Sequence, residues 1–191
     1  RNSMTINDIM DLDTFKLIVR SIAESENLEA MGNRSTQLLV GSLGIKASAI
    51  FALNPETEEI ETLASFGLSI DYLNKGPIKI AKSKGWTSEK EPVVINDITK
   101  TELLQYPEQT KREGIMAMIS IPIIFFGRVI GLLRMYHHET WDISKEDLDT
   151  FSVLAEIIGM AMMYSRILNA LQSVKDSVNE VHSIWLQPKG R

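Results

Sequence analysis

Residues 114–133, GIMAMISIPIIFFGRVIGLL, decide the fold of this 191-residue chain. Two apolar runs of strand length flank Phe126-Gly127, a pair suited to a tight turn, so the segment predicts a β-hairpin. Pro122 lies inside the first run and Gly131 inside the second, although proline cannot donate to a sheet and glycine packs nothing. We therefore expect at each position a bulge, or the close approach of another backbone or of a ligand.

Pairing Phe125 with Arg128 across this turn places apolar side chains on both faces of the hairpin. A sheet that is apolar on both faces has to be covered on both, so we expect three layers: helices, an antiparallel sheet, and a second layer of helices and loops. The expected faces are Met116, Met118, Ser120, Ile124, Val129, Leu133, Met135 and His137 on one side, and Ala117, Ile119, Ile121, Ile123, Ile130, Leu132, Arg134 and Tyr136 on the other.

The sequence before the hairpin predicts helices, strands and turns from its periodicity and capping residues. The expected elements are a helix over residues 11–26 capped by Asp13, a helix over Leu28–Leu43 between Asn27 and Gly44, strands at Ala47–Leu53, Glu59–Phe66 and residues 92–96, a loop with one short strand over residues 67–86, and a helix from a capping box at residues 99–102 to Glu113.

After the hairpin, Ser144 is expected to cap a long helix that carries two stripes. The residues expected to dock on the sheet are Phe151, Leu154, Ala155, Ile158 and Met162. A second set, which we call the seam, recurs every seven residues in two offset series: Ile157, Met160, Tyr164, Ile167, Leu171, Val174, Val178, Val181 and Trp185. Such spacing is typical of a coiled coil, so we expect the seam and the helix over residues 11–26 to pack in a homodimer.

Composition excludes several classes of function. The chain has no cysteine, which removes disulfides, thiolate metal sites and cysteine nucleophiles. A net charge of −5 without any Lys/Arg cluster argues against nucleic-acid binding. We expect no membrane partner, because the longest apolar run is shorter than a span of about 20 residues, and we expect a cytoplasmic protein. Residues 1–3 precede the first methionine, and we interpret them as a cloning remnant or as part of a longer chain.

Three motifs in this order resemble the GAF domain family: EPVVINDI at residues 91–98, the IPIIFFGRVIGLL hairpin, and the acidic-capped helix ending in AEIIGMAM. The resemblance implies an α+β, PAS-like fold with an antiparallel sheet of about six strands, helices on both faces and a ligand cavity. It divides the chain into a flanking helix over residues 1–26, a GAF domain over residues 27–163 and a coiled-coil-like extension over residues 164–187.

Members of the family bind cyclic nucleotides, linear tetrapyrroles, haem, non-haem iron or small organic effectors, and many only dimerise kinases, cyclases or transcription regulators. A covalent bilin and methionine sulfoxide chemistry both require the cysteine that this chain lacks. The cyclic-nucleotide signature begins at Asn74-Lys75 but is not completed. His137 and His138 should point to opposite faces of a strand, which disfavours a shared metal. We expect no cofactor, and no catalytic set of residues is visible.

The resemblance and the hairpin pattern together predict a candidate cavity lined by Trp86, Asn96, Asp97, Tyr106, Met116, Met118, Ser120, Arg134 and Tyr136. Arg134 either binds an anion there or forms an ion pair with Glu113 or Asp97, and the ion pair is the favoured interpretation because buried arginine is rarely unpaired. The aromatic side chains either stack on a planar ligand or plug the pocket.

We expect a non-catalytic small-molecule sensor that dimerises through its flanking helices and acts on a kinase, a cyclase or another regulator. The alternatives are a dimerisation module with a filled cavity, and a metal- or haem-binding sensor.

Overall fold

The computed structural model describes residues 10–54, 56–57, 59–76, 78–79 and 90–186. Its elements are α1 (Leu12–Ala23), α2 (Leu28–Leu43), β1 (Ala47–Leu53), β2 (Glu59–Phe66), α3 (Ile70–Leu73), β3 (Ile78–Lys79), β4 (Val93–Ile95), the 3₁₀ helix η2 (Ile98–Lys100), α4 (Pro107–Arg112), β5 (Ala117–Phe125), β6 (Arg128–His137) and α5 (Lys145–Leu186). The strands form one antiparallel sheet in the order β3-β2-β1-β6-β5-β4, which confirms the predicted six-stranded α+β fold.

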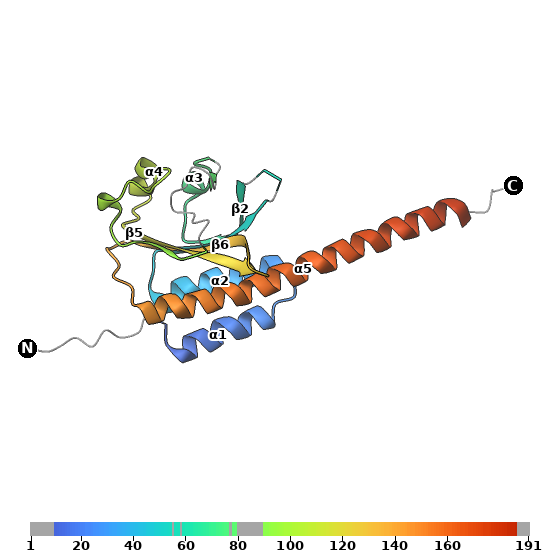
Figure 1. Ribbon diagram of the computed structural model, residues 1–191, viewed down its shortest axis with the longest axis horizontal. Coiled ribbons are helices and arrows are strands. Elements are labelled where there is room, and N and C mark those ends of the chain that lie inside the picture. Colours follow the sequence, from blue (N-terminus) through green and yellow to red (C-terminus); the bar gives the residue numbers. More distant parts are fainter. Residues whose placement is uncertain (1–9, 55, 58, 77, 80–89, 187–191) are drawn as a thin grey trace, which may run out of the picture.

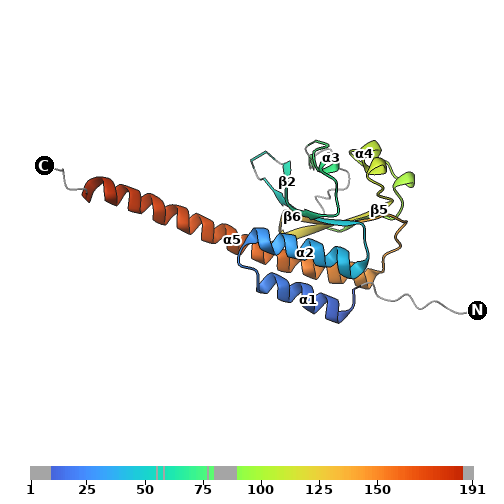
Figure 2. The same ribbon diagram turned by 180° about the vertical axis from the view of Figure 1, so that it is seen from behind.

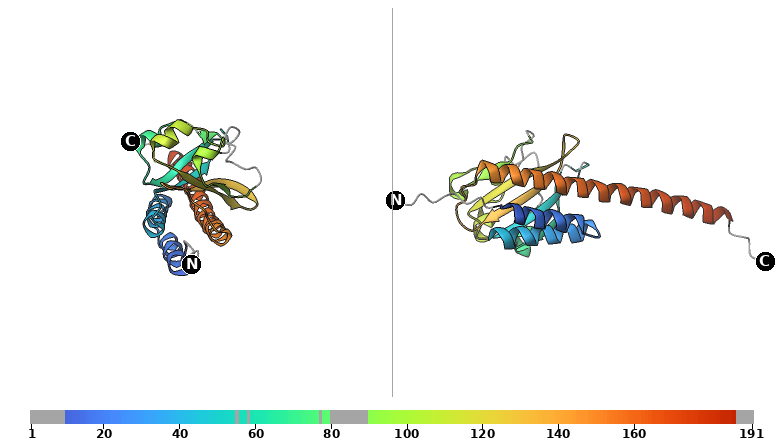
Figure 3. Two further views of the ribbon diagram at one scale, coloured as in Figure 1. Left: turned by 90° about the vertical axis from the view of Figure 1, so that its left-hand side faces the viewer. Right: turned by 90° about the horizontal axis from the view of Figure 1, so that it is seen from below.

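The sheet separates two layers. Helices α1, α2 and α5 lie below one face, whereas the short helices α3 and α4 and their loops lie above the other (Figures 1 and 3). Seen from behind, α2 lies between α1 and the sheet, and α5 runs beside α2 (Figure 2). Each face has its own apolar core, because one buried cluster includes Ile119, Leu133 and Phe151 and a second includes Met118 and Tyr136.

The hairpin has the predicted turn, and Phe125 pairs with Arg128. The predicted faces are wrong, however, because the register shifts by one residue between Ile123 and Ile124. This bulge pairs Ser120 with Arg134 and Met118 with Tyr136 and places all four on the face away from the long helices. Met135, expected beside Met118, lies in the core between the sheet and those helices. A one-residue slip exchanges every later cross-strand partner, which accounts for the whole difference.

Gly131 and Pro122 have separate physical explanations. A Cβ at Gly131 would lie 2.2 Å from the backbone oxygen of Phe51, so the predicted close approach of another backbone is confirmed. Pro122 pairs with Leu132 immediately before the bulge. On its other side, β4 pairs only as far along β5 as Ser120, so the missing N–H of Pro122 interrupts no ladder to β4.

Helix boundaries follow the capping residues. Asp11, not Asp13, caps α1 by accepting from Thr14 N at 2.7 Å. Asn27 caps α2, and Gly44 ends it in the left-handed conformation, as predicted.

The helix expected from residue 99 to Glu113 is instead two short pieces. Asp97 caps η2 through Thr99, and Pro107 begins α4 as its first residue. A proline has no N–H to donate, which is harmless at a helix start and disruptive within a helix. The expected loop over residues 67–86 contains a short helix, α3, because Ser69 accepts from Tyr72 N.

Helix α5 is 42 residues long, or about 63 Å at 1.5 Å per residue. Ser144 Oγ accepts from Asp147 N at 3.0 Å, which confirms the predicted start. The side chains expected to dock on the sheet, Phe151, Leu154, Ala155, Ile158 and Met162, are all buried. Beyond the domain the helix projects outward alone (Figures 1 and 2). Six seam residues, Met160, Tyr164, Ile167, Leu171, Val174 and Val178, are between 52% and 65% exposed.

By length and composition alone, the part of α5 up to Glu180 could cross a membrane, and it is the one such helix in the described part of the chain. The same helix carries Phe151, Leu154 and Ile158, which are fully buried against the sheet. Its apolar composition is therefore explained, over the docked part, by packing inside the domain.

Candidate functional site

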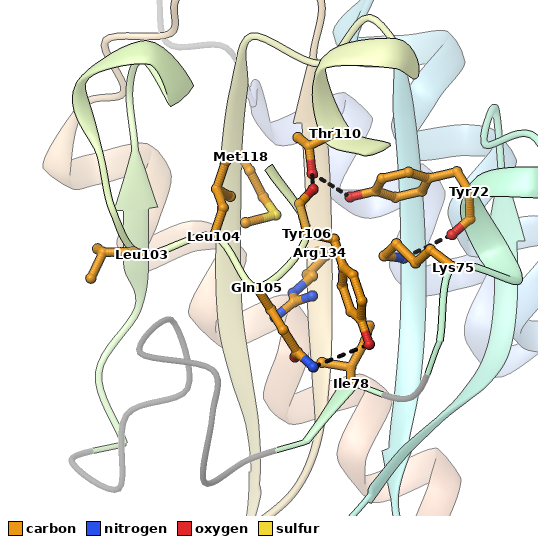
Figure 4. Close-up of a pocket in the computed structure, with 10 residues that line it drawn as sticks. All are labelled: Tyr72, Lys75, Ile78, Leu103, Leu104, Gln105, Tyr106, Thr110, Met118 and Arg134. Carbon is orange, nitrogen blue, oxygen red and sulfur yellow. Dashed lines mark hydrogen bonds between the residues drawn. The ribbon is translucent and has the colours of Figure 1, made fainter. Parts of the chain in front are cut away.

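A cavity lies on the face of the sheet away from α5, beneath α3, α4 and the loop that precedes α4 (Figure 4). Its volume available to water is about 30 Å³, which accommodates about one or two water molecules. The residues that line it are Tyr72, Lys75, Ile78, Leu103, Leu104, Gln105, Tyr106, Thr110, Met118 and Arg134.

Arg134 forms the floor of the cavity from the middle of β6. It is 6% exposed, and its Nε donates a 2.9 Å hydrogen bond to Ser120 Oγ on the paired strand. Its guanidinium carbon lies 5.6 Å from the centre of the Phe51 ring. In the described part of the chain, no carboxylate lies within salt-bridge distance of Arg134, so the ion pair predicted from the sequence is wrong.

Both carboxylates proposed as its partner are engaged elsewhere. Glu113 forms an ion pair with Lys46 at 3.7 Å and accepts from Ser69 N at 2.9 Å. Asp97 caps η2 and forms an ion pair with Lys100 at 3.2 Å. Hydrogen bonds from Thr99 are the largest cause of the lowered pKa of Asp97.

Lys75 enters the cavity from the end of α3. Its Nζ donates to Tyr72 O at 2.9 Å and lies 3.7 Å above the Tyr72 ring. Burial and, second, the positive charge of Arg134 lower the pKa of Lys75 to about 8, while Glu113 acts in the opposite direction. The cavity therefore contains two cationic groups, and one of them, Lys75, has a lowered pKa.

Tyrosines support these groups. Tyr72 and Tyr136 meet edge to face at 6.1 Å, and burial raises the pKa of both phenols. The Tyr72 hydroxyl lies 3.4 Å from Thr110 Oγ1, which donates to Tyr106 O at 2.8 Å. The Tyr106 hydroxyl accepts from Gln105 Nε2 at 3.2 Å. Figure 4 shows Arg134, Lys75 and Tyr106 converging on one part of the cavity.

The residues predicted for the cavity divide into five groups. Tyr106, Met118 and Arg134 line it, and buried Ser120 and Tyr136 lie on the same face of the sheet. Met116 packs at the edge of that apolar cluster without lining the cavity. Asn96 is exposed and accepts from Trp141 N, and Asp97 is the η2 cap, so neither lines the cavity. Trp86 lies outside the described residues.

Sequence reasoning missed Tyr72, Lys75 and Thr110. Ser69 as an N-cap was the available signal for the helix that presents Tyr72 and Lys75. Asn74-Lys75 was noticed only as part of an incomplete nucleotide signature. No local pattern indicates that Thr110 meets Tyr72, because that contact joins residues 38 positions apart.

The histidine pair has no metal-site geometry. Strand β6 ends at His137, and the His137 and His138 rings stack at 4.6 Å rather than point to opposite faces. His137 Nδ1 accepts from Glu139 N, and burial is the main cause of its lowered pKa. No group of three or more metal-ligating side chains occurs among the residues that the structure describes.

Residues 27–162 match the family model described as GAF domain. The fold is similar to a GAF domain from a Coxiella burnetii phosphoenolpyruvate-protein phosphotransferase, with a TM-score of 0.75 and 20% identity over 83% of this chain and 96% of that one. The Acinetobacter GAF domain of the same description has a TM-score of 0.72 and 16% identity over 83% and 96%. Free methionine-R-sulfoxide reductase from Neisseria meningitidis has 0.68 and 14% over 87% and 99%. No curated protein sequence matches the chain.

Proposed function

We propose, from the premise that this chain belongs to the GAF domain family, that it is a non-catalytic sensor domain which works as a homodimer and transmits the state of its cavity through α5. The observation that carries this proposal is the double role of one helix. Residues such as Phe151 and Ile158 fix α5 to the sheet, and seam residues such as Leu171 present an exposed apolar stripe on the same rigid helix.

A second copy of the chain is the occupant that fits the seam. A stripe that repeats every seven residues matches another helix only if that helix has the same repeat, and an identical chain supplies it. Beyond the domain, α5 has no packed neighbour among the described elements, whereas most helical stability in proteins comes from the packing of an apolar face. An apolar groove beside the hairpin tip, lined in part by Phe126, Met163 and Ile167, continues the stripe toward the domain.

Only the sheet separates the cavity from α5, the helix that carries the seam. Along β5 and β6, successive side chains alternate between the cavity face, with Met118 and Arg134, and the α5 face, with Ile119 and Leu133. Helix α5 makes most of its sheet contacts with β5. A ligand that displaces a cavity side chain therefore acts on the strand that seats the helix, and it biases the dimer by its differential affinity for the two arrangements.

The small size of the cavity favours a second candidate function, in which the domain only dimerises a larger protein. Tyr106, Leu104 and Met118 narrow the available space to about 30 Å³. A thermal-shift screen of nucleotides, amino acids and carboxylates separates the two candidates. A reproducible shift that is lost when a cavity residue is changed supports sensing, and the absence of any shift supports the dimerisation module.

Dimerisation itself is tested with the double variant Tyr164→Asp/Leu171→Asp. Tyr164 is 65% exposed and Leu171 is 61% exposed in the single chain. Burying this exposed surface in the interface stabilises the dimer by about 1–2 kcal/mol per side chain. The double variant changes four side chains in the dimer, two in each copy, so it raises the dimer Kd about 1,000-fold or more. The control Asn169→Asp/Asn179→Asp adds the same charge at exposed positions outside the seam. Sedimentation equilibrium measures both, and a tight dimer in the seam variant would remove the proposed interface.

A further inference from the structure

We infer that the cavity binds a small planar oxyanion, a carboxylate or an inorganic anion of similar size, between Arg134 and Lys75. This inference rests on the proposed sensing role of the cavity and names the class of ligand. It comes from the charges in the cavity and not from the fold, because a GAF-type sheet does not require an arginine or a lysine there.

Arg134 is the first support. Its side chain is 6% exposed, its Nε donates to Ser120 Oγ, and its guanidinium also interacts with the Tyr136 hydroxyl. Both of these partners are neutral, so in the described part of the chain the five N–H donors of the guanidinium have no negatively charged acceptor, and Arg134 is part of the cavity lining. A buried guanidinium without a counter-ion is unfavourable, and a planar oxyanion supplies two parallel acceptors that match its fork.

Lys75 is the second support. Its ammonium group has three donor positions, and one of them is used by the backbone carbonyl of Tyr72. No carboxylate lies within salt-bridge distance of Lys75 among the described residues, and Glu113 is held by Lys46 and Ser69. The two cations therefore line the cavity from β6 and from the end of α3, and no carboxylate of the described residues pairs with either of them.

The size of the cavity limits the ligand. A volume of about 30 Å³, enough for about one or two water molecules, restricts the ligand to the smallest oxyanions, and even these require the lining side chains to move slightly. The apolar part of the lining, which includes Ile78, Leu104 and Met118, lowers the local dielectric constant and so strengthens the charge–charge attraction. Formate, nitrate and acetate are among the smallest oxyanions with the required planarity and charge.

The test measures affinity by isothermal titration and thermal stability at constant ionic strength. The probes are acetate, formate and nitrate, and acetamide serves as the neutral isostere of acetate. The variants are Arg134→Met and Lys75→Met, with Arg112→Met and Lys111→Met as matched controls on exposed positions of α4. We expect at least one anion to bind, acetamide to bind at least tenfold more weakly, and each cavity variant to lose about 10- to 100-fold in affinity, as expected for a hydrogen bond to a charged group.

Arg134→Met retains a similar side-chain volume, and Lys75→Met changes a less buried position, so that misfolding of one variant leaves the other informative. Equal binding of acetate and acetamide, or unchanged affinity in both cavity variants, overturns the inference. So does the failure of all three anions to bind. The sensing role is judged separately from the anion. If a neutral compound binds in the cavity and no anion does, the proposed function stands and the anion inference fails. Sedimentation measures the dimer in every variant.

Discussion

Gly159 offers a direct test of how α5 is seated on the sheet. A Cβ at this position would lie 2.8 Å from Ile123 Cγ2 and 3.4 Å from the backbone oxygen of Ile124. Ile123 is fully buried and β-branched, so its methyl group cannot swing away freely. Gly159→Ala therefore forces α5 away from β5 by up to about 1 Å, since carbon atoms in contact lie about 3.5–4.0 Å apart.

Two opposing effects set the magnitude. Overpacking of a core costs about 1–3 kcal/mol, whereas replacing glycine by alanine inside a helix contributes about 1 kcal/mol of stability. The matched control is Gly41→Ala on α2, where a Cβ meets nothing within 4 Å and only the favourable effect operates. We expect the two variants to differ by about 2 kcal/mol, which for a chain of this size separates their Tm values by about 4–8 °C.

Differential scanning calorimetry of the two variants and of the unchanged protein measures this difference. Gly41→Ala should melt above the unchanged protein and Gly159→Ala below Gly41→Ala. If Gly159→Ala raises Tm as much as Gly41→Ala does, the contact between α5 and β5 is loose, and the proposed route from cavity to seam loses its physical basis.

Three further predictions concern the cavity and the fold. The lowered pKa of Lys75, about 8, lies below its value in the unfolded chain, so acetate affinity should fall as pH rises through 8 and Lys75 loses its charge beside Arg134 and Glu113. The affinity should not fall in Lys75→Met, and titration calorimetry between pH 7 and pH 9 decides this. Gly67→Ala should destabilise the fold by at least about 2 kcal/mol in urea unfolding, because Gly67 has φ of +85° and a Cβ would lie 2.3 Å from a backbone oxygen. Asp147→Ala should lower the free energy of unfolding by about 1–3 kcal/mol, because this buried carboxylate accepts from the backbone N–H before α1 and from the serine cap of α5; a loss below about 0.5 kcal/mol would contradict that role.

The sheet and the long helices could be predicted from sequence because their signals are local and repeated. The strand Ala47–Leu53 is a mostly apolar run, Glu59–Phe66 carries alternating residues, and α2 is bounded by Asn27 and Gly44. The hairpin turn was also predictable, but the bulge after Ile123 was not, because a register shift depends on how a strand meets its neighbours and leaves no local pattern.

The cavity was predictable only in part for the same reason. Arg134 was correctly expected to lie in the sheet among apolar neighbours, yet its partner depends on which distant groups are already engaged. Glu113 pairs with Lys46 and accepts from Ser69 because the packing of β1 and α3 brings those two residues close to it. Charge alone could not distinguish an ion pair from an anion site.

The central claim is that the state of the cavity changes the geometry of the seam, and one distance measurement tests it most directly. The chain has no cysteine, so Asn169→Cys on the exposed side of α5 gives a single site for a spin label. Pulsed electron paramagnetic resonance then reports the separation of the two labels in the dimer with and without saturating acetate. We predict that acetate shifts the distance distribution and that Arg134→Met abolishes the shift. Identical distributions under conditions where calorimetry shows acetate bound would contradict the account.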